Sequence, residues 1–237
     1  MEFTLDLQLI RGILAQERER ARGEIRAMGA LRALASSQPR HDARLASAPD
    51  AGTLACRAGC SWCCHFSVDV RAAEVFRILD VIEATFTPGE RARVLAEVRA
   101  NSATLRSLGE EERATRNLEC PFLDAGRCTI YAARPQTCRN YHATDAAGCR
   151  QSWEAPADLG IDPAFAPGVY QAGVAHVEAF SAALRDAGHD VKAYELNAAL
   201  DAALSDPGAR ARFESGLQPF SALGGEDVPA EFDDLEP

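Results

Sequence analysis

All eight cysteines of this 237-residue chain lie in one central stretch, and the long flanks contain none. They are Cys56, Cys60, Cys63, Cys64, Cys120, Cys128, Cys138 and Cys149. We expect a cytoplasmic protein, and because that compartment keeps thiols reduced, four disulfides would serve little purpose there. Eight unrelated buried cysteines are the alternative, but their clustering argues against it. The sequence therefore predicts that the central stretch binds metal.

The cytoplasmic localisation is predicted from the N-terminal segment and from hydropathy. That segment carries acids at Glu2 and Asp6 and has neither a basic region nor a small-residue cleavage site, so we expect a helix of the mature protein rather than a signal peptide. No stretch approaches the roughly 18 consecutive apolar residues that a bilayer requires. No membrane association is expected.

The net charge of -10 is unevenly distributed. Residues 226–236 hold six acids and no base, and the rest of the chain is close to balanced. Nucleic-acid-binding proteins carry a basic stripe, which this chain lacks, so we expect no nucleic-acid partner. The partner is left as an unidentified protein or small molecule.

Apolar residues recur at helical spacing through both flanks. Residues 5–35 predict one helix, which a connector over 36–53 follows. Residues 69–86 predict a second helix. Thr87 begins a capping box for a third, with Pro at its first position. After Pro167 the helical spacing returns.

Near the C-terminus of that later stretch, Gly188 is expected to end one helix and Asp190 to cap the next. Asp206 and Pro207 are expected to begin a last short helix. Between residues 118 and 155 the helical period disappears, and CPFLDAGRCTIY predicts a short hairpin with an Asp-Ala-Gly turn.

The sequence thus predicts a mostly α fold, with helices packed around an irregular cysteine-rich metal-binding centre that contains a small β-hairpin. We divide it into an N-terminal helical segment (1–50), a cysteine-cluster metal-binding core (51–155) with a helical insertion (69–117), a C-terminal helical segment (156–222) and an acidic tail (223–237). We expect the tail to be mobile.

The cysteines form two clusters of different spacing. The first reads C-x3-C-x2-C-C-H from Cys56 to His65, and the second C-x7-C-x9-C-x10-C from Cys120 to Cys149. Thiols on a tight turn can converge on one ion or cluster, and a distant loop can complete its ligand shell. Metal binding would then tie this segment to the helices around it.

These blocks resemble the YkgJ-type cysteine-cluster family, described as a zinc- or iron-chelating domain. The resemblance rests on the cysteine run 56–64, the C-P-F-L of 120–123, the C-x-I-Y-x-x-R-P-x-x-C-R block of 128–139 and the trailing Cys149. It covers roughly residues 56–149 and includes all eight cysteines. It implies metal chelation.

Flagellin lysine methylase resembles the same motif set more distantly, and it is associated with an iron-sulfur cluster and S-adenosylmethionine. For this chain that resemblance implies a possible methyl-transfer-like reaction by analogy only, and it assigns no substrate.

Iron-sulfur and zinc both fit the cysteines. Structural zinc sites usually combine two C-x2-C pairs, and here only Cys60 and Cys63 form one. Short runs with irregularly spaced later ligands suit an iron-sulfur cluster, which we slightly favour. The eight thiolates could serve one cluster with spare thiols, two clusters, or two four-cysteine zinc sites.

Several neighbours have alternative interpretations. Cys64 directly follows Cys63, so it is either a ligand of a second metal or a buried thiol. His65 and His142 could replace a sulfur, although an ordinary core or surface histidine is the commoner outcome. Trp62 and Tyr131 are expected to pack over the site.

Two arginines next to Cys138 are expected to act on the centre. Arg134 and Arg139 should offset its negative charge and donate hydrogen bonds to sulfur. Substrate binding by residues 139–142 is the alternative to such support of the metal.

No nucleophile-base-orienter set is visible, so whether the protein is an enzyme stays open. The leading hypothesis is a metal-binding cysteine-cluster protein, with iron-sulfur slightly favoured and possible group transfer. The alternatives are a structural zinc-binding module and a metal-handling or redox-sensing module without catalysis.

Overall fold

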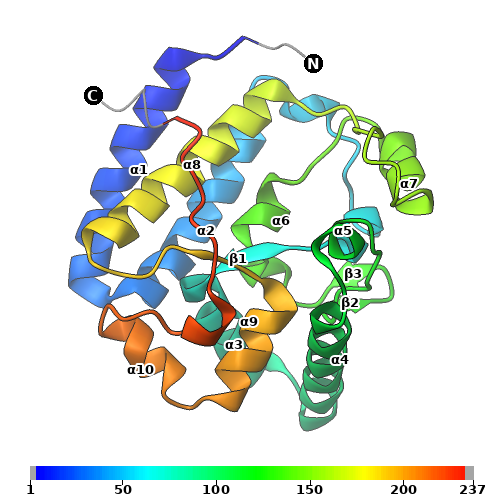
Figure 1. The fold of residues 1–237 in the computed structure, drawn as a ribbon. Coiled ribbons are helices and arrows are strands. Elements are labelled where there is room, and N and C mark those ends of the chain that lie inside the picture. The colour runs from blue at the N-terminus through cyan, green and yellow to red at the C-terminus, as the bar shows by residue number, and fades with distance from the viewer. Residues whose placement is uncertain (1–3, 233–237) are drawn as a thin grey trace.

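The computed structural model describes residues 4–232, with the side chains of residues 110 and 114 left aside. Three long helices form one side of the molecule (Figure 1). They are α1 (Leu7–Met28), α2 (Ala30–Ser47) and α8 (Pro167–Asp186). Asp6 caps α1 by accepting a hydrogen bond from the Leu9 backbone at 2.9 Å. Gly29, with a φ of 84°, ends α1 and lets the chain turn into α2.

The predicted connector over residues 36–53 is wrong for most of its length, because residues 36–47 belong to α2. Pro39 lies inside this helix. Ser37 and His41 are completely buried and hydrogen-bonded to other helices. A hydrophobic-periodicity search misses such a helix, since part of its buried face is polar.

Four further helices pack around an apolar cluster to which α1, α2 and α8 also contribute. They are α3 (Ala72–Thr85), α4 (Pro88–Arg106), α9 (Leu196–Ser205) and α10 (Ala209–Glu214). The predicted cap of α4 is confirmed, because Thr87 accepts from the Glu90 backbone and Glu90 in turn accepts from the Thr87 backbone. Val94 and Val98 of this helix are completely buried.

A two-stranded antiparallel sheet joins the central segment to the C-terminal flank. Strand β1 (Asp69–Arg71) pairs with β4 (Ala193–Glu195), and the buried Val70 faces Tyr194. The helix predicted over 69–86 therefore begins at Ala72, three residues later than predicted, because residues 69–71 form β1. The prediction that Asp190 caps the next helix is also wrong, because β4 intervenes and Glu195 caps α9.

The cysteine-bearing segment consists of short elements on the right-hand side of Figure 1. They are η1 (Ala51–Thr53), η2 (Trp62–His65), α5 (Glu110–Ala114), β2 (Leu123–Asp124), β3 (Arg127–Cys128), η3 (Tyr131–Ala133), α6 (Gln136–Asn140) and α7 (Ala146–Glu154). The predicted hairpin is confirmed: Leu123 pairs with Cys128 across a turn in which Ala125 and Gly126 both have positive φ.

The chain ends in a segment that follows η4 (Ser221–Leu223) back across α8, drawn in red in Figure 1. Ala193 and Glu226 exchange two backbone hydrogen bonds of 2.9 Å. The backbone of Phe232 donates to Glu178 at 3.1 Å. The structure thus places residues 223–232 of the predicted mobile tail against the helices, and residues 233–237 lie outside the described residues.

The observed fold is mostly α, as predicted. None of the helices within residues 4–232 combines the length and the apolar character that a membrane crossing requires.

Candidate metal centre

Backbone hydrogen bonds bring the two cysteine clusters together from distant parts of the sequence. The Cys120 backbone donates to the Cys64 carbonyl at 2.8 Å, and Leu118 donates to His65 at 2.8 Å. On the other side, Ala55 donates to the Ala143 carbonyl at 2.9 Å. The turn that carries the first cluster is therefore held between the loop before the hairpin and the loop after α6.

Four cysteines form what we call the inner group: Cys64, Cys120, Cys128 and Cys138. Burial and then the charges of the other three thiolates raise the pKa of Cys138. Burial is also the main reason why the pKa of Cys120 rises to about 12, and Cys128 and Cys64 contribute. Like charges that disfavour one another's ionisation lie close together, so these four sulfurs share one region of low polarity.

The other four form the outer group: Cys56, Cys60, Cys63 and Cys149. Burial raises the pKa of Cys149, followed by the charges of Cys56 and Cys60. The pKa of Tyr141 rises to about 12 through burial and then the charge of Cys149, with Cys63 and Cys56 contributing. Cys149 is buried on α7, whereas Cys56 is exposed.

The two groups meet at the consecutive Cys63 and Cys64. A hydrogen bond from the Cys63 thiol lowers the pKa of Cys64 to about 7, and the same bond is the largest cause of the raised pKa of Cys63. Cys64 acts electrostatically on Cys120, Cys128 and Cys138. Consecutive cysteines thus let one turn contribute a thiol to each group.

Backbone N–H groups point at three of the sulfurs. Hydrogen bonds from Phe122 to Cys120 and from Ile130 to Cys128 favour the two thiolates, each from the residue two places after its cysteine. Ala143 donates to the Cys56 sulfur at 3.5 Å. Such N–H···S bonds stabilise the charge of metal-bound thiolates and tune iron-sulfur centres. The donor set therefore fits a thiolate-ligated metal in both groups.

Within residues 4–232, no three side chains of His, Cys, Asp or Glu stand in a coordinating arrangement. The cysteines influence one another's pKa, yet the described side chains form no ready-made coordination site. Metal binding commonly supplies the last ordering step, because free thiols prefer hydrogen bonds or apolar contacts to close mutual approach.

The two arginines beside Cys138 act through charge, as expected, since both lower the pKa of Cys128 against the larger opposing effect of its burial. The expected hydrogen bonds to sulfur are not among the contacts of the described residues. Arg139 instead donates to the carbonyls of Ala132 and Arg134 at 2.6 and 3.1 Å, and both arginines pair with Asp42. They brace the turn from the hairpin into α6.

Neither adjacent histidine is directed at the sulfurs. The His65 Nδ1 lies 3.2 Å from the Ser61 carbonyl, and its Nε2 lies 3.7 Å from Glu119. Burial lowers the pKa of His142, and the charge acting on it is that of Asp50, not of a cysteine. Both ring nitrogens of His142 are buried without a hydrogen-bond partner among the described residues.

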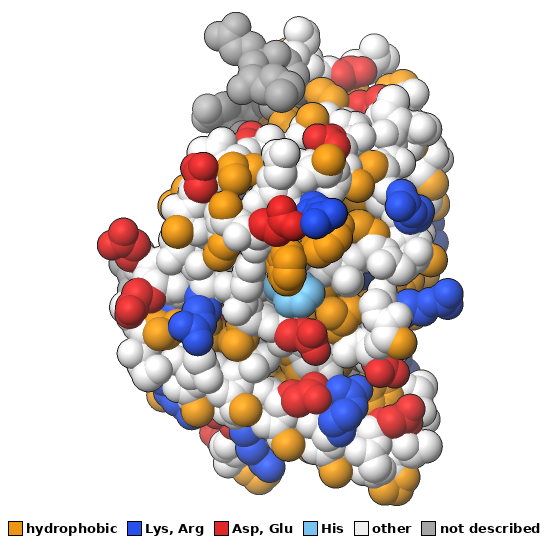
Figure 2. Space-filling view, turned by 90° about the vertical axis from the view of Figure 1, so that its right-hand side faces the viewer, with side chains coloured by type: hydrophobic (Ala, Val, Ile, Leu, Met, Phe, Trp, Pro, Cys, Tyr) orange, Lys and Arg blue, Asp and Glu red, His pale blue; other side chains and the backbone are white. Residues whose placement is uncertain are grey.

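Aromatic side chains cover part of the centre. Trp62 lies 5.1 Å from Trp153 between ring centroids, and His65 meets Trp153 edge-on at 5.7 Å. This packing joins η2 to α7. Figure 2 shows the side of the molecule that lies on the right in Figure 1, where hydrophobic side chains adjoin a histidine. Trp62 is therefore placed as expected. Tyr131 is not, because it is 64 % exposed and stacks on Arg134.

Two supporting acids escape the sequence analysis. Glu74 is buried and accepts hydrogen bonds from the backbones of Gln136 at 2.6 Å and Arg71 at 2.8 Å, so it fixes the start of α6. Asp42 pairs with both arginines from α2. Glu74 lies in the first turn of α3, three residues after its N-cap Arg71, and this capping-box spacing is the signal for the first acid. Asp42 lies in the segment predicted to be a connector.

Comparison with known proteins gives one match. Residues 55–157 match the CxxCxxCC family, described as "Putative zinc- or iron-chelating domain". No curated protein and no solved structure matches the chain. The match includes all eight cysteines and leaves the helical flanks outside. The match spans less than half of the chain, and it shows that residues 55–157 are similar to a cysteine-rich module described as zinc- or iron-chelating.

Proposed function

We propose that this protein binds two metal centres, each ligated by four cysteines. The inner group would hold one through Cys64, Cys120, Cys128 and Cys138. The outer group would hold the other through Cys56, Cys60, Cys63 and Cys149. The observation that carries this proposal is that Cys120, Cys128 and Cys64 act on Cys138, whereas Cys56 and Cys60 act on Cys149. Cys63, on which both Cys138 and Cys56 act, lies between the two groups, and its place in the outer group follows from assigning Cys64 to the inner one.

Iron-sulfur is the favoured occupant. The ligand spacing supports it, because seven, nine and ten residues separate the later cysteines and only Cys60 and Cys63 make a zinc-type pair. Backbone N–H groups aimed at sulfur support it as well, since they stabilise the negative charge that a cluster distributes over its ligands. Two structural zinc ions are the alternative with the same ligands.

A bound cluster would supply redox or Lewis-acid chemistry next to the aromatic face of η2 and α7. Methyl transfer from S-adenosylmethionine stays a prediction by analogy. The protein's own residues would position and shield the centres: Arg134 and Arg139 offset thiolate charge, and Trp62 and Trp153 limit access of water. We propose a cytoplasmic location, in keeping with reduced thiols.

Cysteine variants test the division into two groups. Cys120→Ala should remove the metal of the inner centre, and Cys149→Ala that of the outer centre. The double variant should bind none. Metal per chain would be measured by elemental analysis after anaerobic purification, and circular dichroism would show whether the helical flanks remain folded.

His65→Ala is the matched control, because this side chain lies beside the cysteines and faces Glu119. It should retain full metal content. Loss of all metal in either single cysteine variant would mean one shared centre and would contradict the proposal, as would full retention in both.

A further inference from the structure

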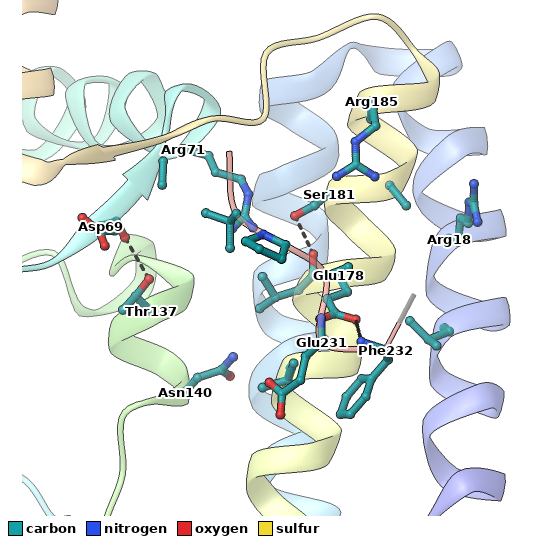
Figure 3. Close-up of a pocket in the computed structure, with 18 of the residues that line it drawn as sticks. Arg18, Asp69, Arg71, Thr137, Asn140, Glu178, Ser181, Arg185, Glu231 and Phe232 are labelled. Atoms are coloured by element: carbon teal, nitrogen blue, oxygen red, sulfur yellow. Dashed lines mark hydrogen bonds between the residues drawn. The ribbon is translucent and has the colours of Figure 1, made fainter. Parts of the chain in front are cut away.

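A cavity of about 310 Å³ lies beside α6, and no cysteine lines it. Its walls come from α1, β1, α6, α8 and the C-terminal segment 228–232 (Figure 3). Thr137 and Asn140 line it from α6, the helix that also carries Cys138 of the inner group. The cavity and the proposed inner centre therefore share one short helix.

Two guanidinium groups at this cavity have no anionic partner. Arg71 extends into it from the end of β1, and Arg185 reaches it from the last turn of α8 (Figure 3). Neither side chain has a hydrogen bond or ion pair among the described residues, and the Nε atom of Arg71 is buried without a partner. Arg185 is exposed and Arg71 is half-buried, so it is the buried part of the Arg71 guanidinium whose charge is costly without an anion beside it.

The charges around Arg71 act in both directions. Burial lowers its pKa most, Glu74 and Glu178 raise it, and Arg185 lowers it further. Glu74 is already engaged with two backbone N–H groups. Glu178 accepts hydrogen bonds from the backbones of Glu231 and Phe232. Both nearby carboxylates thus accept hydrogen bonds from backbone N–H groups rather than from the two arginines. The positive charges of Arg71 and Arg185 repel one another across the cavity.

The residues that line the cavity also indicate the size, polarity and charge of a ligand that would fit it. Val70, Val174, Val177 and Phe232 contribute apolar surface, and the volume is at the small end for ligand pockets. Glu178 and Glu231 on the wall would repel a doubly charged phosphate more strongly than a singly charged carboxylate. A guanidinium fork pairs well with a carboxylate.

We propose that this cavity binds a small monocarboxylic acid with an apolar body, its carboxylate held between Arg71 and Arg185. Thr137 and Asn140 stand where they can meet a polar substituent of that acid. The site makes no use of the cysteines, so it stands independently of the proposed metal centres.

Calorimetric titration of the full chain with sodium hexanoate tests the proposal, with hexylamine and inorganic phosphate as comparison probes. Hexanoate should bind, and it should bind at least about tenfold more tightly than either comparison probe. Absence of hexanoate binding, or tighter binding of hexylamine or phosphate, would overturn the assignment.

Two variants locate the binding. Arg71→Gln and Arg185→Gln should each weaken hexanoate binding by about tenfold or more, while Arg93→Gln, on the exposed face of α4 and paired with Glu97, should not. Arg185 is exposed, so its variant keeps the test decisive if Arg71→Gln fails to fold. Unchanged affinity in Arg185→Gln would place hexanoate elsewhere and contradict the proposal. The metal content of both variants should equal that of the wild type, which separates this test from the test of the cysteine groups.

Discussion

Buried polar side chains connect the helical flank to the cysteine centre. Ser37 donates to Glu17 at 2.8 Å and lies 2.8 Å from the His176 Nε2. His176 stacks on His41 with ring centroids 4.6 Å apart, and the His41 Nε2 lies 2.7 Å from the Asn140 Oδ1. Asn140 is two residues from Cys138. These contacts tie α1, α2 and α8 to α6 and favour one arrangement of the helices over others.

The close approach of α8 to Asn140 makes Gly173 a sensitive position. A Cβ at residue 173 would lie 2.2 Å from the Asn140 Oδ1 and 3.0 Å from Leu45. Gly173→Ala should therefore displace Asn140 from His41 and lower the free energy of unfolding by about 1–3 kcal/mol, as overpacking typically does. Chemical denaturation measures this.

Gly12→Ala is the matched control on α1, because no atom lies within 4 Å of its Cβ position. It should stabilise the protein by up to about 1 kcal/mol, since alanine favours helix more than glycine does. Equal effects of the two substitutions would mean that Asn140 does not occupy the notch at Gly173.

His176 should make stability depend on pH. Burial holds its pKa at about 3, with the charges of Arg44, Arg40 and Arg139 contributing, although Glu17 lies 3.7 Å from its Nδ1. The folded state therefore binds fewer protons than the unfolded state between pH 3 and the ordinary histidine pKa of about 6.5. Its contribution to stability is complete above that pKa and is lost as the pH falls.

We expect the free energy of unfolding to fall by about 1.4 kcal/mol per pH unit from this histidine between about pH 6 and pH 4. In His176→Gln this part of the slope should disappear. Denaturation series at several pH values would show it, and identical slopes for both proteins would indicate that His176 titrates normally when folded.

At the scale of elements, the hairpin β2–β3 positions two of the four inner cysteines. Cys128 lies on β3 and pairs with Leu123 of β2. Leu123 comes three residues after Cys120, so the hairpin fixes both cysteines. Ala125 in the turn has a φ of 47°, a conformation that costs a residue with a Cβ about 1 kcal/mol. Asn-Gly is the preferred pair for such turns.

Ala125→Asn should therefore stabilise the protein by about 0.5–1 kcal/mol and leave its metal content unchanged. Ala103→Asn, at an exposed position of α4, should instead destabilise it by about 0.5 kcal/mol. Thermal melting of both variants checks the signs. A loss of stability in Ala125→Asn would show that the turn differs from the one described.

Sequence patterns predict elements well where one signal dominates. The capping box at Thr87, the apolar face of α8 and the hairpin turn each predicted its element correctly. Sequence patterns failed where the buried side chains are polar, as around Ser37 and His41 in α2. They also failed for strands of only three residues, as in β1 and β4. Their clustering in the sequence marks the cysteines as candidate ligands, which stays a prediction, whereas the proposed grouping rests on tertiary contacts that the sequence does not show.

For the whole molecule, the C-terminal segment packs onto the helical body rather than leaving it. Phe232 is 2 % exposed in an apolar cluster with Ile10, Leu14 and Ala175. The segment also forms one wall of the cavity at Arg71. The acidic composition of this segment predicted a mobile tail. Its packing on the helices depends instead on one aromatic side chain and on backbone hydrogen bonds, which composition does not reveal.

Phe232→Ala should lower the free energy of unfolding by about 1–3 kcal/mol, less than a central core phenylalanine would, because the segment can detach locally. Val228→Ala, at a residue 47 % exposed, should have little effect. Hydrogen exchange at Glu226 and Phe232 would report detachment directly. If Phe232→Ala melts like the wild type, the segment does not contribute to the folded body.

The proposal of two four-cysteine metal centres is tested most directly by X-ray absorption at the metal edge, together with iron, zinc and sulfide analysis, on anaerobically purified protein. The account predicts a first shell of sulfur alone and enough metal for two centres per chain, with iron and sulfide in equal amounts. Zinc in place of iron, with the same all-sulfur shell, would retain the ligands and change the occupant. A shell of nitrogen or oxygen, or protein without metal, would contradict it.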